Sequence, residues 1–165
     1  MMKRLSDIGL RTFAGTLALV SAGLLVTVFA MQHLGGLAPC PLCVWQRYPH
    51  GAVILMGVLG AAFGGLRARW LIAGAGLAFL VTASIGVFQV GVEQRWWEGL
   101  AACTGGSGVP ESLAELQSQL GKPAAPRCDE VAWSLFGISL AGYNALVSLG
   151  IACLAFGRAM LPERV

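Results

Sequence analysis

Four long stretches without a charged residue constrain the fold of this chain more than any other feature of its sequence. They cover residues 12–46, 48–66, 70–92 and 131–157. A helix needs about 20 apolar residues to cross the hydrocarbon core of a bilayer. Only 12% of the 165 residues are charged, against about 25% in ordinary soluble domains. The sequence therefore predicts an all-α integral membrane protein, a four-helix bundle in the lipid bilayer.

The charge-free stretches predict one transmembrane domain over residues 1–165. The predicted spanning helices cover residues 12–33, 50–66, 70–92 and 134–157, and the outer loops cover residues 34–49 and 93–133. Pro49 has no N–H to donate, so we expect a short helical turn or a kink before the regular second helix. Residues 67–69 would form the short turn between the second and third helices.

The second outer loop carries a helix signal of its own. Ser112 and Glu115 fit a capping box, and leucines follow at helical spacing. This pattern predicts a short amphipathic helix over residues 110–120, lying on the membrane surface.

The basic residues predict the orientation of the bundle. If both termini face the cytoplasm, seven of the 11 basic residues lie on the inner side and six of the eight acidic residues on the outer side. This is the bias that positive-inside insertion produces. The net charge of +3 is therefore a topology signal, and it requires no nucleic-acid partner.

Four cysteines fall on the outer side, where stable disulfides can persist: Cys40, Cys43, Cys103 and Cys128. Arg47 follows Cys43 by one helical turn on the same face. A cysteine near a helix N-terminus and an arginine is stabilised as the thiolate, which is the reactive form. A plainer role for Arg47 is to extend towards the lipid headgroups. The fifth cysteine, Cys153, is expected to pack in the fourth helix without a redox role.

Other chemistries fit these cysteines less well. A c-type haem needs a histidine directly after the C-x-x-C pair, and this chain has Val44 there. Zinc sites usually contain two short cysteine spacings, whereas Cys103 and Cys128 are 25 residues apart. A non-enzymatic scaffold with two structural disulfides remains an alternative. However, a C-x-x-C bridge closes almost no loop, so a redox relay explains the pattern better.

The order of these features resembles the bacterial DsbB family of inner-membrane oxidoreductases. The resemblance rests on Pro-Cys-x-x-Cys followed by Arg47, on residues 88–93 before two tryptophans, and on residues 128–133 leading into residues 136–139. It covers nearly the whole chain. It implies a protein of the bacterial inner membrane that reoxidises a periplasmic DsbA-like dithiol oxidase, a thioredoxin-fold protein, and passes the electrons to a quinone.

The resemblance also implies roles for individual residues. Cys103 and Cys128 would be the pair that meets the partner, with Cys103 forming the mixed disulfide. Cys40 and Cys43 would pass the electrons to ubiquinone or menaquinone, with Cys43 next to the ring. Arg47 would contact the quinone. No metal is expected.

Two points lie outside this pattern. By the same resemblance, position 89 is Gln where many relatives carry His, so no titrating side chain is expected there. A vitamin-K-epoxide-reductase-like or DsbI-like enzyme, with the same bundle and another partner, is the alternative within redox chemistry.

Overall fold

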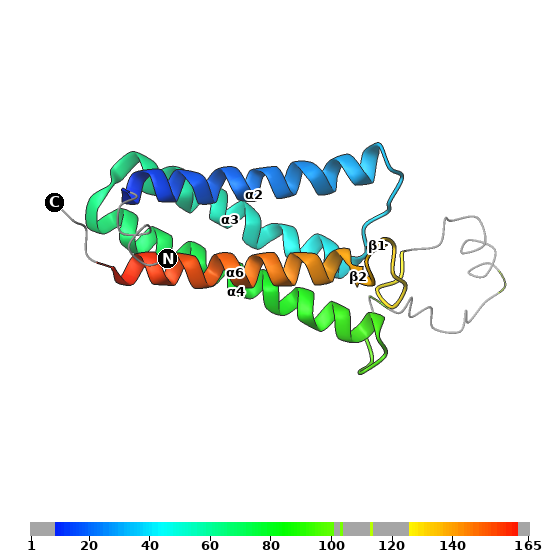
Figure 1. Ribbon diagram of the computed structural model, residues 1–165. Helices are drawn as coiled ribbons and strands as arrows, with labels where there is room; N and C mark the ends of the chain where they lie inside the picture. Colours follow the sequence, from blue (N-terminus) through cyan, green and yellow to red (C-terminus); the bar gives the residue numbers. More distant parts are fainter. Residues whose placement is uncertain (1–8, 101–102, 104–112, 114–125, 162–165) are drawn as a thin grey trace.

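The computed structural model describes residues 9–100, 103, 113 and 126–161, and within these residues it contains four helices. They are α2 (Leu10–His33), α3 (Pro41–Phe63), α4 (Gly65–Glu93) and α6 (Leu140–Met160). A two-stranded antiparallel sheet of β1 (Ser134–Leu135) and β2 (Ile138–Ser139) precedes α6. The prediction of an all-α four-helix bundle is confirmed, and the sheet is a small addition to it (Figure 1).

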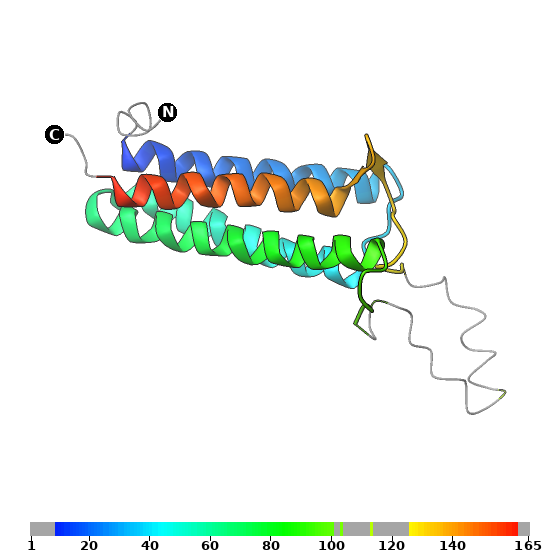
Figure 2. The same ribbon diagram turned by 60° about the horizontal axis from the view of Figure 1, so that its bottom comes forward.

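The helices run up and down alongside one another. α4 packs against both α3 and α6, and α3 also packs against α2. The start of α2 and the end of α6 lie at one end of the bundle, while the α2–α3 connection and the sheet lie at the other (Figures 1 and 2). The N-terminus of α3, where the C-x-x-C pair begins, is therefore at the end remote from the start of α2 and the end of α6.

Three of the four helices, α2, α4 and α6, are long and apolar enough to cross a membrane by length and composition. α3 has 23 residues, but its first turns contain polar side chains that reduce its hydropathy. Two of these, Gln46 and His50, are buried at 7% and 4% exposure. α3 thus directs these two polar side chains into the bundle.

The prediction that the regular second helix starts near residue 50 was wrong. α3 begins at Pro41, with Cys40 as its N-cap, and it continues through Pro49. Carbonyl groups beside Pro49 receive hydrogen bonds from other helices: Thr82 Oγ1 donates to the Gln46 carbonyl (3.2 Å) and Ser21 Oγ to the His50 carbonyl (3.1 Å). Such neighbours make a proline tolerable within a membrane helix.

The predicted turn at residues 67–69 is also displaced. The chain reverses at Gly64 and Gly65, whose φ angles of +69° and +55° suit glycine, and residues 67–69 already belong to α4. Small residues allow α3 to pack closely against α2 at Gly60. A Cβ atom at Gly60 would lie 2.8 Å from the Cβ of Ala14 in α2.

The fourth helix starts at Leu140 and not at residue 134. Residues 134–139 instead form a hairpin, whose turn residues Phe136 and Gly137 both have positive φ, as two-residue hairpin loops favour. Ser139 then caps α6, because its Oγ accepts from the Gly142 N–H (3.2 Å). The predicted amphipathic helix over residues 110–120 falls outside the described residues, except for the exposed Leu113.

Candidate redox site

The start of α3 brings the first two cysteines together. Pro41 occupies the first helical turn, and the Cys40 sulfur accepts a hydrogen bond from the Cys43 N–H (3.4 Å). The Cys40 thiol in turn donates to Cys43 Sγ over 2.9 Å. Cys40 is buried, Cys43 is half-buried, and both are free thiols in this structure. The Cys43 sulfur therefore lies at a helix N-terminus with a donor already directed at it, as its spacing predicted.

The two predicted cysteine pairs meet in one buried cluster. Cys40, Cys103 and Cys128 are each at most 4% exposed, and Cys43 packs against them. The Cys128 N–H donates to the Cys103 carbonyl (2.9 Å), and the Cys128 side chain packs with Cys40 and Cys103 in this cluster. Burial, reinforced by the interaction with Cys103, raises the pKa of the Cys128 thiol to about 12. The cluster thus joins the loop pair to the helix pair.

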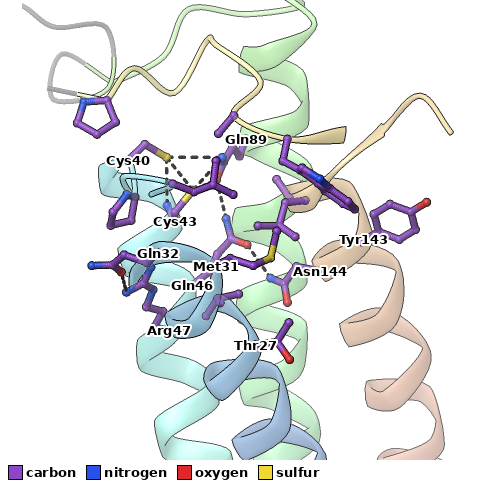
Figure 3. Close-up of a pocket in the computed structure, with 18 of the residues that line it drawn as sticks. Thr27, Met31, Gln32, Cys40, Cys43, Gln46, Arg47, Gln89, Tyr143 and Asn144 are labelled. Atoms are coloured by element: carbon purple, nitrogen blue, oxygen red, sulfur yellow. Dashed lines mark hydrogen bonds between the residues drawn. The ribbon is translucent and has the colours of Figure 1, made fainter. Parts of the chain in front are cut away.

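A carboxamide from α4 contacts both sulfurs of the C-x-x-C pair. Gln89 Nε2 lies 3.3 Å from Cys43 Sγ and 3.6 Å from Cys40 Sγ (Figure 3). The same nitrogen donates to Glu93 Oε1 (3.4 Å), one turn further along α4. The other oxygen, Glu93 Oε2, is buried and has no hydrogen-bond partner among the described residues. A neutral donor and an acidic group therefore adjoin the thiols.

A cavity of about 210 Å³ lies beside Cys43. Its walls come from all four helices and from the residues before α3 and α6, and most of its side chains are apolar, including Leu24, Val28, Met31, Leu37 and Val147. An engineered apolar cavity of about 150 Å³ holds a benzene molecule, so this one has room for a substituted ring. Val147 is exposed, so the cavity reaches the outer surface of the bundle.

Arg47 lines the same cavity, on the face of α3 that carries Cys43. Its Nη1 donates to Gln32 Oε1 of α2 (2.9 Å), and its guanidinium carbon lies 4.7 Å from the centre of the Phe29 ring. The Arg47 Nε–H is buried and finds no acceptor among the described residues. The arginine is therefore anchored on α2 with a donor left over, an arrangement that goes beyond simple extension towards headgroups.

The sequence did not single out several polar residues that the fold brings to this cavity. These are Gln46, His50, Glu93 and Asn144. Their common signal is that they are polar residues in or beside apolar stretches, where such residues are costly and often functional. Within the described part of the chain, no group of three or more His, Cys, Asp or Glu side chains is suited to hold a metal ion.

Cys153 lies on α6, 13 residues after its first residue, and takes no part in the cysteine cluster. It is exposed on the surface of the bundle. It faces outward, where a small apolar side chain can contact lipid, and its lack of a redox role stays a prediction.

Comparison with known proteins is consistent with this site. No solved structure matches the chain significantly. Disulfide bond formation protein B of Dechloromonas aromatica is 30% identical over 158 residues, which cover 91% of this chain and 92% of the relative. Disulfide bond formation protein B 2 of Pseudomonas aeruginosa is 32% identical, covering 86% and 89%. The corresponding protein of Marinobacter nauticus is 33% identical, covering 82% and 83%.

The family model described as disulfide bond formation protein DsbB matches residues 10–157. That range includes every described helix almost in full and all four clustered cysteines. The chain belongs to the DsbB family of disulfide bond formation proteins, and it is a membrane protein with a disulfide oxidoreductase site.

Proposed function

We propose that this protein oxidises the dithiol of a DsbA-like, thioredoxin-fold partner in the periplasm and passes the two electrons to a membrane quinone. One observation carries the proposal: cysteines from two distant segments meet in a single buried cluster, and one of them, Cys43, borders an apolar cavity. Thiols in contact can exchange disulfides, and an apolar cavity open at the surface of a membrane bundle suits a lipid-soluble acceptor.

The contacts suggest the order of exchange when both pairs are oxidised. A partner thiolate attacks Cys103 Sγ, forming a mixed disulfide and releasing Cys128 as a thiolate. Cys128, which lies in the same buried cluster as Cys40, attacks Cys40 Sγ and releases Cys43. The second partner thiolate then attacks the partner's own sulfur in the mixed disulfide, so that the partner leaves oxidised and Cys103 leaves as a thiolate.

The relay then resets. Cys103 attacks Cys128 Sγ, which restores the Cys103–Cys128 disulfide and releases Cys40 beside Cys43. The partner has lost two electrons and two protons, and the C-x-x-C pair now holds the electrons as a dithiol. A quinone, when bound, accepts two electrons and two protons. Loss of these from Cys40 and Cys43 re-forms their disulfide and completes the balance.

The residues around the cavity fit a quinone. Its apolar walls suit a ring with an isoprenoid tail, and the unsatisfied Arg47 Nε–H suits a carbonyl oxygen that gains negative charge. Arg47 stays charged at any relevant pH, and its bond to Gln32 and its contact with the Phe29 ring keep it at the cavity wall. Gln89 holds the Cys43 sulfur by a hydrogen bond from the α4 side.

The experiment is a quinone-reduction assay with purified protein and a reduced thioredoxin-fold dithiol oxidase. We expect the wild-type protein to reduce ubiquinone-1 or a short-chain menaquinone, and we expect Cys43→Ala and Cys103→Ala to abolish turnover. Turnover that survives in either variant would exclude the relay. A scaffold with structural disulfides would show no quinone reduction in any form.

Arg47→Ala provides a second test within the same assay. Loss of a hydrogen bond to a charged group weakens binding by about 1.5–3 kcal/mol, so the apparent KM for quinone should rise at least about tenfold. Arg67→Ala is the matched control, because Arg67 is exposed near the start of α4, at the opposite end of the bundle. Equal KM values for the two variants would remove Arg47 from the quinone site.

A further inference from the structure

A continuous chain of hydrogen bonds leads from the Cys43 sulfur into the interior of the bundle. Gln89 Nε2 donates to Cys43 Sγ (3.3 Å), and Gln89 Oε1 accepts from Gln46 Nε2 (2.7 Å). Gln46 Oε1 accepts from Asn144 Nδ2 (2.6 Å), as Figure 3 shows. Asn144 Oδ1 lies 3.1 Å from His50 Nε2. Three carboxamides, from α4, α3 and α6, therefore link one thiol to one imidazole.

Every member of this chain points the same way. Each carboxamide directs its N–H towards Cys43 and its carbonyl oxygen towards His50. Because a carbonyl oxygen only accepts, His50 Nε2 is the protonated ring nitrogen in its bond with Asn144. Aligned hydrogen bonds polarise one another in an interior of low dielectric constant. Together, the aligned hydrogen bonds produce a positive electrostatic potential at the Cys43 sulfur, because the Gln89 N–H faces it.

Contacts at both ends hold the chain in this direction. At one end, Glu93 Oε1 accepts from Gln89 Nε2 (3.4 Å), which keeps the amino group of Gln89 on the side of the sulfurs. At the other end, the Ser148 hydroxyl also donates to Asn144 Oδ1 (3.2 Å), and Asn144 Nδ2 also donates to Thr82 Oγ1 (3.1 Å). Because its oxygen and its amino group are both hydrogen-bonded, the Asn144 carboxamide cannot flip end for end without losing several hydrogen bonds at once.

The reverse arrangement would favour the opposite state of the thiol. If all three carboxamides were inverted, Gln89 would present its carbonyl oxygen to Cys43 and stabilise the neutral S–H group. In the structure, Gln89 Oε1 lies 3.7 Å from Cys43 Sγ, whereas Gln89 Nε2 lies only 3.3 Å from the same sulfur. The observed direction is therefore the one that favours the thiolate.

We propose that Gln46, Asn144 and His50 are positioning residues that hold the Gln89 carboxamide with its N–H on Cys43 and thereby stabilise the Cys43 thiolate. This rests on the proposed function only in that Cys43 is the sulfur that faces the quinone cavity. Gln46 donates to Gln89, and Asn144 donates to Gln46, so both act on the Cys43 sulfur through Gln89.

The test measures how fast Cys43 is alkylated in the reduced full-length protein, without quinone or partner. Limiting iodoacetamide is added at pH 7, and the Cys43 peptide is quantified by mass spectrometry. We expect Gln46→Met and Asn144→Leu, which carry no new charge, each to slow alkylation about threefold. This is the net result of about tenfold less thiolate, partly offset because more basic thiolates are more nucleophilic.

Ile72→Ala is the matched control. Ile72 is a buried residue of the apolar core on α4, the helix that carries Gln89, and its side chain forms no hydrogen bond. We expect this variant to lower thermal stability, because it leaves a cavity in the core, while Cys43 alkylation stays at the wild-type rate. Cys43 alkylated at the wild-type rate in both Gln46→Met and Asn144→Leu, or equal slowing in Ile72→Ala, would overturn the proposal.

This outcome is separable from the fate of the proposed function. The two chain variants lie on different helices, so a folding defect in one leaves the other to decide. The alkylation assay contains neither quinone nor partner. The proposal on the hydrogen-bond network can therefore be refuted while the protein still reduces quinone. Conversely, that proposal can be confirmed in a protein that reduces no quinone.

Discussion

Cys128 has the most unusual environment of the reactive residues outside the helices. Its side chain is fully buried in a cluster with the loop residue Cys103 and with Cys40, the N-cap of α3. A thiol in this position is protected from stray reagents until a neighbouring sulfur is attacked. For a relay residue, that protection limits side reactions with other thiols.

The raised pKa of Cys128 leads to a prediction on pH dependence. Below its pKa, the thiolate fraction of a thiol rises tenfold per pH unit, and an ordinary cysteine levels off near pH 8.5. Burial and the bond with Cys103 raise the pKa of Cys128 to about 12. In the reduced protein, alkylation of Cys128 should therefore still rise steeply between pH 9 and pH 10. A plateau below pH 9 in peptide-resolved alkylation would contradict the buried state of this thiol.

At the scale of elements, the α2–α3 interface depends on the absence of side chains. A Cβ atom on Gly57 would lie 2.6 Å from the Ala14 carbonyl oxygen and 2.8 Å from the Ala18 Cβ. The backbones of the two helices approach closely here, and close approach is a main source of helix association in lipid. This contact also holds α2, and with it Gln32 and Phe29, against α3 and its Arg47.

Gly57→Ala should therefore destabilise the bundle by about 1–3 kcal/mol, the usual cost of overpacking an interface. Gly51→Ala is the matched control, because Gly51 lies in the same helix and a Cβ there meets nothing within 4 Å. That control should be neutral or slightly stabilising, since alanine is the better helix former. Thermal denaturation in detergent measures both variants, and equal midpoints would show that the interface can widen at no cost.

At the scale of the whole molecule, the bundle separates its cysteine cluster from the end where α2 begins and α6 ends (Figure 2). Basic residues gather near the latter end, including Arg11, Arg67, Arg69 and Arg158. Short basic segments stay in the cytoplasm during insertion, so the cysteine end would face the periplasm.

Alkaline phosphatase fusions test this topology, because the enzyme needs an oxidising compartment to form its disulfides. Leu100 is the last residue of the continuously described segment after α4. A fusion after Leu100 should be active, and a fusion after Met160 should be inactive. The opposite pattern of activities would invert the orientation and place the cysteines in the cytoplasm.

Some features follow from the order of residues alone. Charge-free stretches indicate membrane helices because lipid excludes charge, and a C-x-x-C pair with Arg47 one turn later is a local pattern. The four clustered cysteines and Arg47 can therefore be identified from the sequence. The boundaries of α3 and α6 cannot, because Pro49 is tolerated only through side chains of other helices, and a two-residue hairpin leaves little trace in composition.

The network around Cys43 depends entirely on the tertiary structure. Gln46 and Asn144 are 98 residues apart in the sequence, and Gln89 lies between them. Periodicity reports which residues share a helical face, but it does not report how four helices rotate against one another. By itself, the sequence determined that this is a membrane bundle with four cysteines outside its charge-poor spans or at their ends. Only packing decided that these cysteines meet, and that three carboxamides align on one of them, because both depend on contacts between distant segments.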